Sequence, residues 1–169
     1  MKPVLVLVGP PGAGKSTVGR LLAHRLGVRF RDTDVDIVAR VGKPIAEVFI
    51  DDGEEHFRAL ERDAVQRALQ EHDGVLSLGG GAVLAESTRR LLQAHTVALL
   101  DVDLSHATSR VGLNRDRPVL ALNPRAQLKA LLEQRMPLYR EVASITVDTN
   151  RRGAKQVVDA LVDALASPA

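Results

Sequence analysis

Apolar positions along the chain alternate between short continuous runs and stretches with helical spacing. The continuous runs are short enough to be buried strands, and they span residues 4–8, 28–31, 75–78, 96–100 and 144–147. Helical spacing predicts helices over residues 15–26, 34–41, 45–51, 54–70, 87–93, 104–111, 125–139 and 154–165. Short apolar strands that alternate with helices favour a mostly parallel sheet with helices on both faces. We therefore expect a single α/β domain over residues 1–169, with a five-stranded parallel sheet in a three-layer α/β/α arrangement.

Residues with strong end preferences mark several of the expected boundaries. Gly27 and Gly42 follow two of the expected helices and are typical helix ends. Ser87 is a candidate N-cap, and Pro137 is expected to interrupt the helix of residues 125–139 near its end. The polar stretch from residue 112 to 124 contains Gly, Asn and Pro, which predicts a mobile loop.

The first strand leads directly into a glycine-rich loop, with the sequence GPPGAGKST at residues 9–17. A strand, this Gly-x-x-x-x-Gly-Lys-Ser pattern and a helix, in that order, are typical of proteins that bind the phosphates of ATP or GTP. Glycines let the loop backbone approach the phosphates, which then face N–H groups at the start of the helix. Lys15 can reach the β- and γ-phosphates, and the Ser16 hydroxyl is placed to bind Mg²⁺. The expected nucleotide-binding residues are Gly12, Ala13, Gly14, Lys15, Ser16 and Thr17.

Two acidic residues, Asp32 and Asp34, follow the second expected strand. Ligands of parallel α/β folds lie beyond the carboxyl ends of the strands, where both residues are found. Alternation along an extended segment would place both carboxylates on one face. One could then hold Mg²⁺ through water while the other meets an incoming hydroxyl group. The alternative is that Asp34 caps the following helix and that Asp32 is solvated.

Two further features suit the binding of an anionic substrate. The glycine run of residues 79–81 follows the third expected strand, where its backbone N–H groups could meet an anion, unless it is only a flexible turn. In the helix of residues 54–70, Arg58 and Glu61 are three positions apart and share a face. A glutamate that fixes an arginine fork suits a planar carboxylate, whereas an isolated pair of this kind is more often a surface ion pair.

Arg117 lies in the polar loop, within the sequence NRDRP at residues 114–118. An arginine delivered by a closing lid can neutralise charge on a transferred phosphoryl group, although loop arginines are usually solvated. Arg135 is a second basic residue near a helix end. The five histidines show no metal-ligand spacing, so we expect them to be structural.

Composition excludes several other classes of protein. The chain has 23 Lys and Arg against 21 Asp and Glu, and only 2% of its residues are aromatic, so nucleic acid is not an expected partner. With no cysteine it has neither disulfides nor a thiol nucleophile. The apolar start is too short for a membrane span or a signal peptide, so we expect a cytoplasmic protein. We also expect a monomer.

Taken together, these stretches resemble shikimate kinases, a family of the nucleoside-monophosphate-kinase-like P-loop group. The resemblance covers nearly the whole chain. It rests on the phosphate loop, DTD at 32–34, GEEHFR at 53–58 with Glu61, LGGGA at 78–82, Arg117 and Pro118, RMPLY at 135–139 and VDTN at 147–150.

The resemblance implies transfer of the γ-phosphoryl group of ATP to the 3-hydroxyl of shikimate, on the route to chorismate and the aromatic amino acids. It implies that Asp34 is the general base, that Lys15 and Arg117 stabilise the transferring group, and that Ser16 and Asp32 serve Mg²⁺. In the family, shikimate is bound by residues that match Asp34, Arg58, Gly79, Gly80, Gly81 and Arg135. Arg110, Arg117 and Arg152 are the implied ATP contacts outside the phosphate loop. The family also has a substrate-binding segment, here about 34–61, and a mobile lid, here about 112–123.

Two alternatives to this function remain open at the level of sequence. Another small-molecule kinase of the same fold, such as a gluconate kinase, would also take a hydroxy acid. A nucleotide-dependent switch would bind ATP without an acceptor, but it would leave Arg58 and Arg135 without a role.

Overall fold

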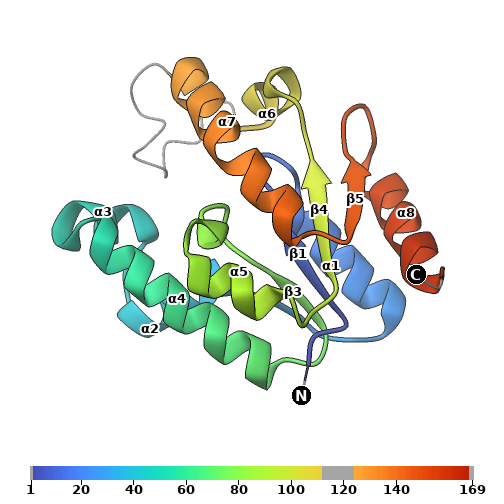
Figure 1. The fold of residues 1–169 in the computed structure, drawn as a ribbon, viewed down its shortest axis with the longest axis horizontal. Coiled ribbons are helices and arrows are strands. Elements are labelled where there is room, and N and C mark those ends of the chain that lie inside the picture. Colours follow the sequence, from blue (N-terminus) through green and yellow to red (C-terminus); the bar gives the residue numbers. More distant parts are fainter. Residues whose placement is uncertain (1, 112–123, 168–169) are drawn as a thin grey trace.

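The computed structural model describes residues 2–111 and 124–167, and it contains a five-stranded sheet (Figure 1). The strands are β1 (Leu5–Val8), β2 (Phe30–Asp32), β3 (Val75–Ser77), β4 (Val97–Asp101) and β5 (Ile145–Asp148). All neighbouring strands are parallel, in the order β2-β3-β1-β4-β5. The predicted parallel sheet is confirmed. The expected lid and Arg117 lie outside the described residues.

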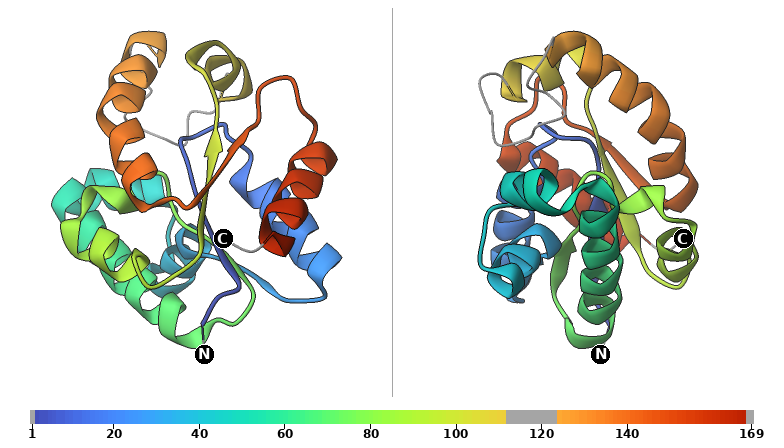
Figure 2. Two further views of the ribbon diagram at one scale, coloured as in Figure 1. Left: turned by 45° about the vertical axis from the view of Figure 1, so that its right-hand side comes forward. Right: turned by 90° about the vertical axis from the view of Figure 1, so that its left-hand side faces the viewer.

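Helices cover both faces of the sheet, as Figures 1 and 2 show. They are α1 (Lys15–Leu26), α2 (Thr33–Val41), α3 (Ile45–Asp52), α4 (Glu54–Glu71), α5 (Glu86–Leu92), α6 (Leu104–Val111), α7 (Pro124–Val142) and α8 (Ala154–Ala166), with a short 3₁₀ helix η1 (Ala82–Leu84). Along β1, Leu5 and Leu7 face a core built with α1 and α8, whereas Val6 and Val8 face a core built with α4, α5 and α7. Alternation along one buried strand thus joins the three layers.

A smaller apolar cluster holds α2, α3 and the first half of α4 together. It contains Ile37, Val48, Phe57 and Ala64, all of which are buried. This part of the chain projects from the sheet edge next to β2 and β3 (Figure 2). It coincides with the expected substrate-binding segment. None of the helices in the described part of the chain is long and apolar enough to span a bilayer.

Two local predictions were wrong, and one short element was not predicted. Ser87 is not an N-cap, because α5 begins at Glu86 with no capping side chain. Pro137 does not end α7, which continues to Val142. Proline removes one backbone hydrogen bond, and burial of the Tyr139 ring beyond it keeps the last turn in place. The turn η1, which follows the glycine run, was not predicted.

Candidate functional site

The phosphate loop leads into α1 with a backbone that only glycine adopts readily. Gly9, Gly12 and Gly14 all have positive φ, and a Cβ atom on Gly9 would lie 2.7 Å from the Leu100 carbonyl oxygen. Gly14 is the N-cap of α1 and offers no side chain to cap it, so the first N–H groups of the helix are open to an anion. The Lys15 ammonium donates to the carbonyl of Gly9 at 2.6 Å, which folds the side chain over the loop.

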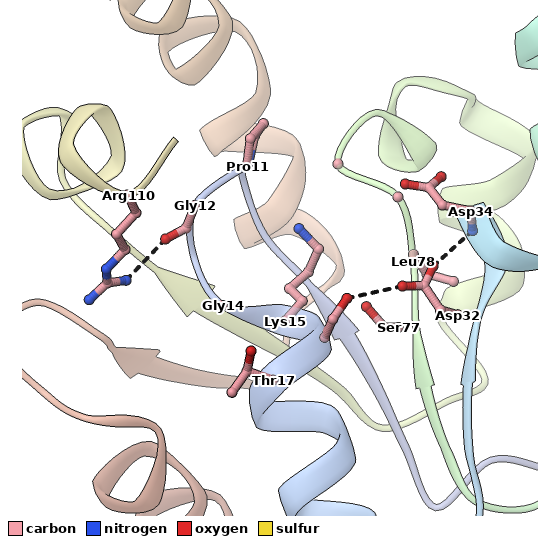
Figure 3. Close-up of a pocket in the computed structure, with 13 residues that line it drawn as sticks. Pro11, Gly12, Gly14, Lys15, Thr17, Asp32, Asp34, Ser77, Leu78 and Arg110 are labelled. Atoms are coloured by element: carbon pink, nitrogen blue, oxygen red, sulfur yellow. Dashed lines mark hydrogen bonds between the residues drawn. The ribbon is translucent and has the colours of Figure 1, made fainter. Parts of the chain in front are cut away.

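An open cavity of about 320 Å³ lies between this loop and the ends of β2 and β3 (Figure 3). Its lining comes from the phosphate loop, the start of α1, the two aspartates, the end of β3 and α6. The residues are Pro11, Gly12, Gly14, Lys15, Ser16, Thr17, Asp32, Asp34, Ser77, Leu78, Gly79, Gly80 and Arg110. The cavity therefore brings the predicted phosphate and metal residues together with Asp34, Gly79 and Gly80. The other predicted acceptor residues, Arg58, Gly81 and Arg135, do not line it.

The two aspartates do not lie on one extended segment, so that prediction was wrong. The chain leaves β2 at Asp32, whose carboxylate accepts the Asp34 N–H at 2.8 Å and thereby caps α2. The capping residue is Asp32, not Asp34, and Asp32 is partly buried rather than fully solvated. Its other carboxylate oxygen accepts the Ser16 hydroxyl at 3.1 Å. The carboxylate of Asp34 points instead toward Gly79, where an added Cβ would lie 2.5 Å from it.

Arg58 is held in a largely buried setting rather than in a surface ion pair. Its guanidinium donates to the Glu61 carboxylate at 2.8 Å, and Glu61 is only 3% exposed. The rings of Phe57 and Phe49 contact one another at a tilt of 32°, with centroids 4.8 Å apart. The guanidinium group of Arg58 lies 5.3 Å from the Phe57 centroid and 6.0 Å from the Phe49 centroid. Arg135, from α7, is also buried.

The guanidinium groups of Arg58 and Arg135 could together bind a further anion. Burial raises the pKa of Glu61, although the Arg58 charge acts in the opposite direction. Burial also lowers the pKa of Arg135, which Tyr139 opposes, and the neighbouring Arg58 charge lowers it further. Among the described residues, the buried Nε atoms of Arg58 and Arg135 have no hydrogen-bond partner. A carboxylate suits two neighbouring guanidinium groups, of which Arg58 is the one paired with the buried Glu61.

The glycine run owes its composition to close packing rather than to flexibility. Gly79, Gly80 and Gly81 all avoid positive φ. A Cβ atom on Gly81 would lie 2.2 Å from an Arg58 nitrogen, and one on Gly80 would lie 3.5 Å from an Arg135 nitrogen. A larger residue at position 79 would displace the side chain of Asp34, which lines the cavity, and one at position 81 would displace the guanidinium group of Arg58.

A second cavity, of about 190 Å³, adjoins the first on the side of β5 and α8. Arg110 and Arg152 both line it, and it shares Gly14, Thr17 and Arg110 with the first cavity. Arg110 donates to the carbonyls of Gly12 at 3.1 Å and Thr149 at 2.7 Å. This arginine therefore links the phosphate loop to the end of β5.

Sequence reasoning missed two residues that support the site. Thr33 is fully buried, and its hydroxyl accepts the Gly79 N–H at 3.2 Å. The Tyr139 hydroxyl donates to the Gly80 carbonyl at 2.5 Å. Thr33 lies between the two aspartates in the sequence, and Tyr139 lies one helical turn after Arg135. Their positions next to predicted site residues were the sequence signal that could have identified them.

Glu61→Gln is expected to flatten the pH dependence of stability. Because burial raises the pKa of Glu61 above its ordinary value of 4.5, the folded state binds this proton more tightly than the unfolded chain does. The stability from this group is complete below that value and is lost as the pH rises through the raised pKa. In urea denaturation, wild type should lose more free energy of unfolding than Glu61→Gln as the pH rises above the ordinary value of 4.5. The surface variant Glu86→Gln is the control, and identical pH profiles for wild type and Glu61→Gln would contradict the expectation.

Comparison with known proteins points to one family. The family model described as shikimate kinase matches residues 11–166. The shikimate kinase of Salinispora arenicola is 61% identical over 157 residues, which cover 93% of this chain and 94% of the relative. That of Saccharopolyspora erythraea is 58% identical over 164 residues, with coverage of 96% and 94%.

Solved structures agree with the sequence relatives. Shikimate kinase from Acinetobacter baumannii in complex with shikimate has a TM-score of 0.93 and 36% identity, covering 98% of this chain and 93% of that one. The Aquifex aeolicus shikimate kinase has a TM-score of 0.84 and 30% identity, with 95% coverage of both chains. A gluconokinase from Sinorhizobium meliloti has a TM-score of 0.62 at 21% identity over 97% of this chain and 91% of that one, which shows a shared fold alone.

Proposed function

This chain belongs to the shikimate kinase family, and we propose that it transfers the γ-phosphoryl group of ATP to the 3-hydroxyl of shikimate. The products are shikimate 3-phosphate and ADP. The reaction is a step in the biosynthesis of chorismate and the aromatic amino acids. The observation that carries the assignment of roles is the pair of guanidinium groups at the glycine run, that of Arg58, which is largely buried and paired with Glu61, and that of Arg135, which is buried. Because every residue of the proposal comes from one chain, we propose that the monomer is active.

The acceptor carboxylate would bind between Arg58 and Arg135. Both guanidinium groups approach the glycine run. A carboxylate can accept hydrogen bonds from both of them. The ring hydroxyls would then face Asp34 across Gly79, because the Asp34 carboxylate lies at that glycine.

Asp34 would accept the proton as the reaction proceeds. The oxygen of the 3-hydroxyl forms a bond to the γ-phosphorus, the bond from that phosphorus to the β,γ-bridging oxygen breaks, and ADP leaves with those electrons. The hydroxyl proton passes to the Asp34 carboxylate. Lys15 and the N–H groups at the start of α1 would stabilise the negative charge of the transferring group. The role predicted for Arg117 stays a prediction, since this residue lies outside the described part.

Ser16 and Asp32 fit a magnesium ion by the chemistry of their donors. Their oxygen atoms are 3.1 Å apart in the cavity, and Mg²⁺ prefers oxygen ligands with several positions left to water and phosphate. Within residues 2–111 and 124–167, no three acidic or histidine side chains gather as a metal site. A two-oxygen protein contribution suits an ion that arrives with ATP. When bound, it would supply positive charge to the phosphates.

The adjoining cavity is the proposed site of the adenosine part of ATP. It begins at Gly14 and Thr17, where the phosphate loop ends, and it is bounded by Arg110 and Arg152. The flat face of a guanidinium group can stack on an aromatic base. Arg110, which already bridges Gly12 and Thr149, is thus placed between base and phosphates.

Release of ADP in the presence of different acceptors tests this function. Mg-ATP turnover would be followed with shikimate, gluconate, a nucleoside monophosphate or no acceptor. We expect stimulation by shikimate alone. Stimulation by gluconate instead would indicate a different small-molecule kinase, and ATP binding with no stimulation by any acceptor would indicate a nucleotide-dependent switch.

A further inference from the structure

Tyr139 lies in the RMPLY stretch of α7, and no step of the proposed transfer uses it. Its ring is fully buried in the apolar core between the sheet and helices α4, α5 and α7. Its hydroxyl donates to the Gly80 carbonyl at 2.5 Å and is also a hydrogen-bond partner of the Arg135 guanidinium, one helical turn earlier. A single buried hydroxyl therefore joins Arg135 to the glycine run.

The bond to Gly80 also fixes the direction of the next peptide group. A peptide bond is planar and trans, so its C=O and N–H point in opposite directions. With the Gly80 carbonyl held by Tyr139, the Gly81 N–H must face away from the tyrosine. An added Cβ on Gly80 would lie 3.5 Å from both Arg135 and Pro11, which places this peptide where the arginine and the phosphate loop meet.

We propose that the Tyr139 hydroxyl is a positioning group that holds Arg135 and the Gly80–Gly81 peptide in one arrangement for the acceptor carboxylate. The inference rests on the proposed function, in which Arg135 binds that carboxylate. A fork of this kind must be held to within about 0.5 Å by its supporting hydrogen bonds. The buried Nε of Arg135 lacks a partner among the described residues, so the bond to the Tyr139 hydroxyl helps to fix the other end of the guanidinium group. Loss of the hydroxyl would also leave the Gly80 carbonyl buried without a donor.

The test is the affinity of shikimate for wild type and Tyr139→Phe, measured by isothermal titration calorimetry, together with kcat and KM for both substrates. Phenylalanine keeps the ring in the core and removes the hydroxyl alone. We expect shikimate to bind about tenfold more weakly, with KM for ATP and kcat changed less than about threefold. Ser144→Ala is the matched control, because the Ser144 hydroxyl also donates to a carbonyl, that of Val97, but away from the site.

A double variant separates positioning from general stability. If Tyr139 acts partly through Arg135, adding Tyr139→Phe to Arg135→Lys should weaken shikimate binding by a smaller factor than Tyr139→Phe does in wild type. A lowered melting temperature with unchanged shikimate affinity in Tyr139→Phe, or full additivity in the double variant, would overturn the inference. Wild type that binds shikimate without releasing ADP would contradict the proposed function alone. Wild type that does not bind shikimate would overturn both.

Discussion

Asp34→Asn is expected to lower kcat by about a thousandfold while KM for ATP changes less than about twofold. The amide has the shape of the carboxylate but cannot take the proton of the acceptor hydroxyl. The side chain of Asp34 lies at Gly79, whereas the phosphates are expected at the start of α1, so nucleotide binding should not depend on it. Steady-state kinetics with each substrate varied, and nucleotide binding measured separately, give both quantities.

Asp36→Asn is the matched control for this variant. Asp36 lies on the same helix, but its carboxylate pairs with Arg31 at 2.7 Å, outside the cavity. We expect its kcat to stay within about twofold of wild type. An equal loss of ATP binding and kcat in Asp34→Asn would contradict the role of Asp34 as a base, because the residue would then act on the nucleotide.

Arg58→Ala is expected to raise KM for shikimate by about a hundredfold with a much smaller change in kcat. The variant removes one of the two guanidinium groups and leaves Glu61, which is almost fully buried, without its partner. The negative charge of Glu61 would then oppose the acceptor carboxylate. Kinetics with shikimate varied at saturating ATP, and a melting curve, measure the two effects.

Two further variants show whether the fork or the charge of Arg58 matters. Arg58→Lys keeps a positive charge near Glu61 but loses the planar fork, so its KM should lie between those of wild type and Arg58→Ala. Arg67→Ala removes an arginine from the exposed side of α4, where it pairs with Asp63 at 2.9 Å, and should behave as wild type. A wild-type KM in Arg58→Ala would exclude Arg58 from the acceptor site.

The sequence predicted the sheet and most helices because these elements depend on the local spacing of apolar residues. Helix α1 begins and ends where expected, since the phosphate loop precedes it and Gly27, with φ of 69°, ends it. Asp32 shows where this reasoning fails. Two acidic residues after a strand are compatible with two arrangements, an extended segment and a helix cap. The structure shows the cap, in which Asp32 accepts both the Asp34 N–H and the Ser16 hydroxyl, and the position of Ser16 cannot be read from the local sequence.

The environment of the arginines depends on contacts between distant segments. Glu61 lies on the same helical stripe as Phe57, Val65 and Ala68, so an acidic residue within an apolar stripe was a signal of a buried carboxylate. The second arginine of the site, Arg135, comes from α7, and no local sequence pattern shows that it meets the glycine run. For the same reason, the close packing that requires glycine at position 81 could not be predicted.

The measurement that tests the account most directly is ADP release with shikimate and with its methyl ester, for wild type and Arg58→Ala. The ester keeps the ring and hydroxyls but carries no charge on the carboxyl group. We predict that the ester has a much higher KM than the acid with wild type, and that this difference nearly disappears in Arg58→Ala. Equal KM values for acid and ester with wild type would contradict the claim that buried arginines select the acceptor by its carboxylate.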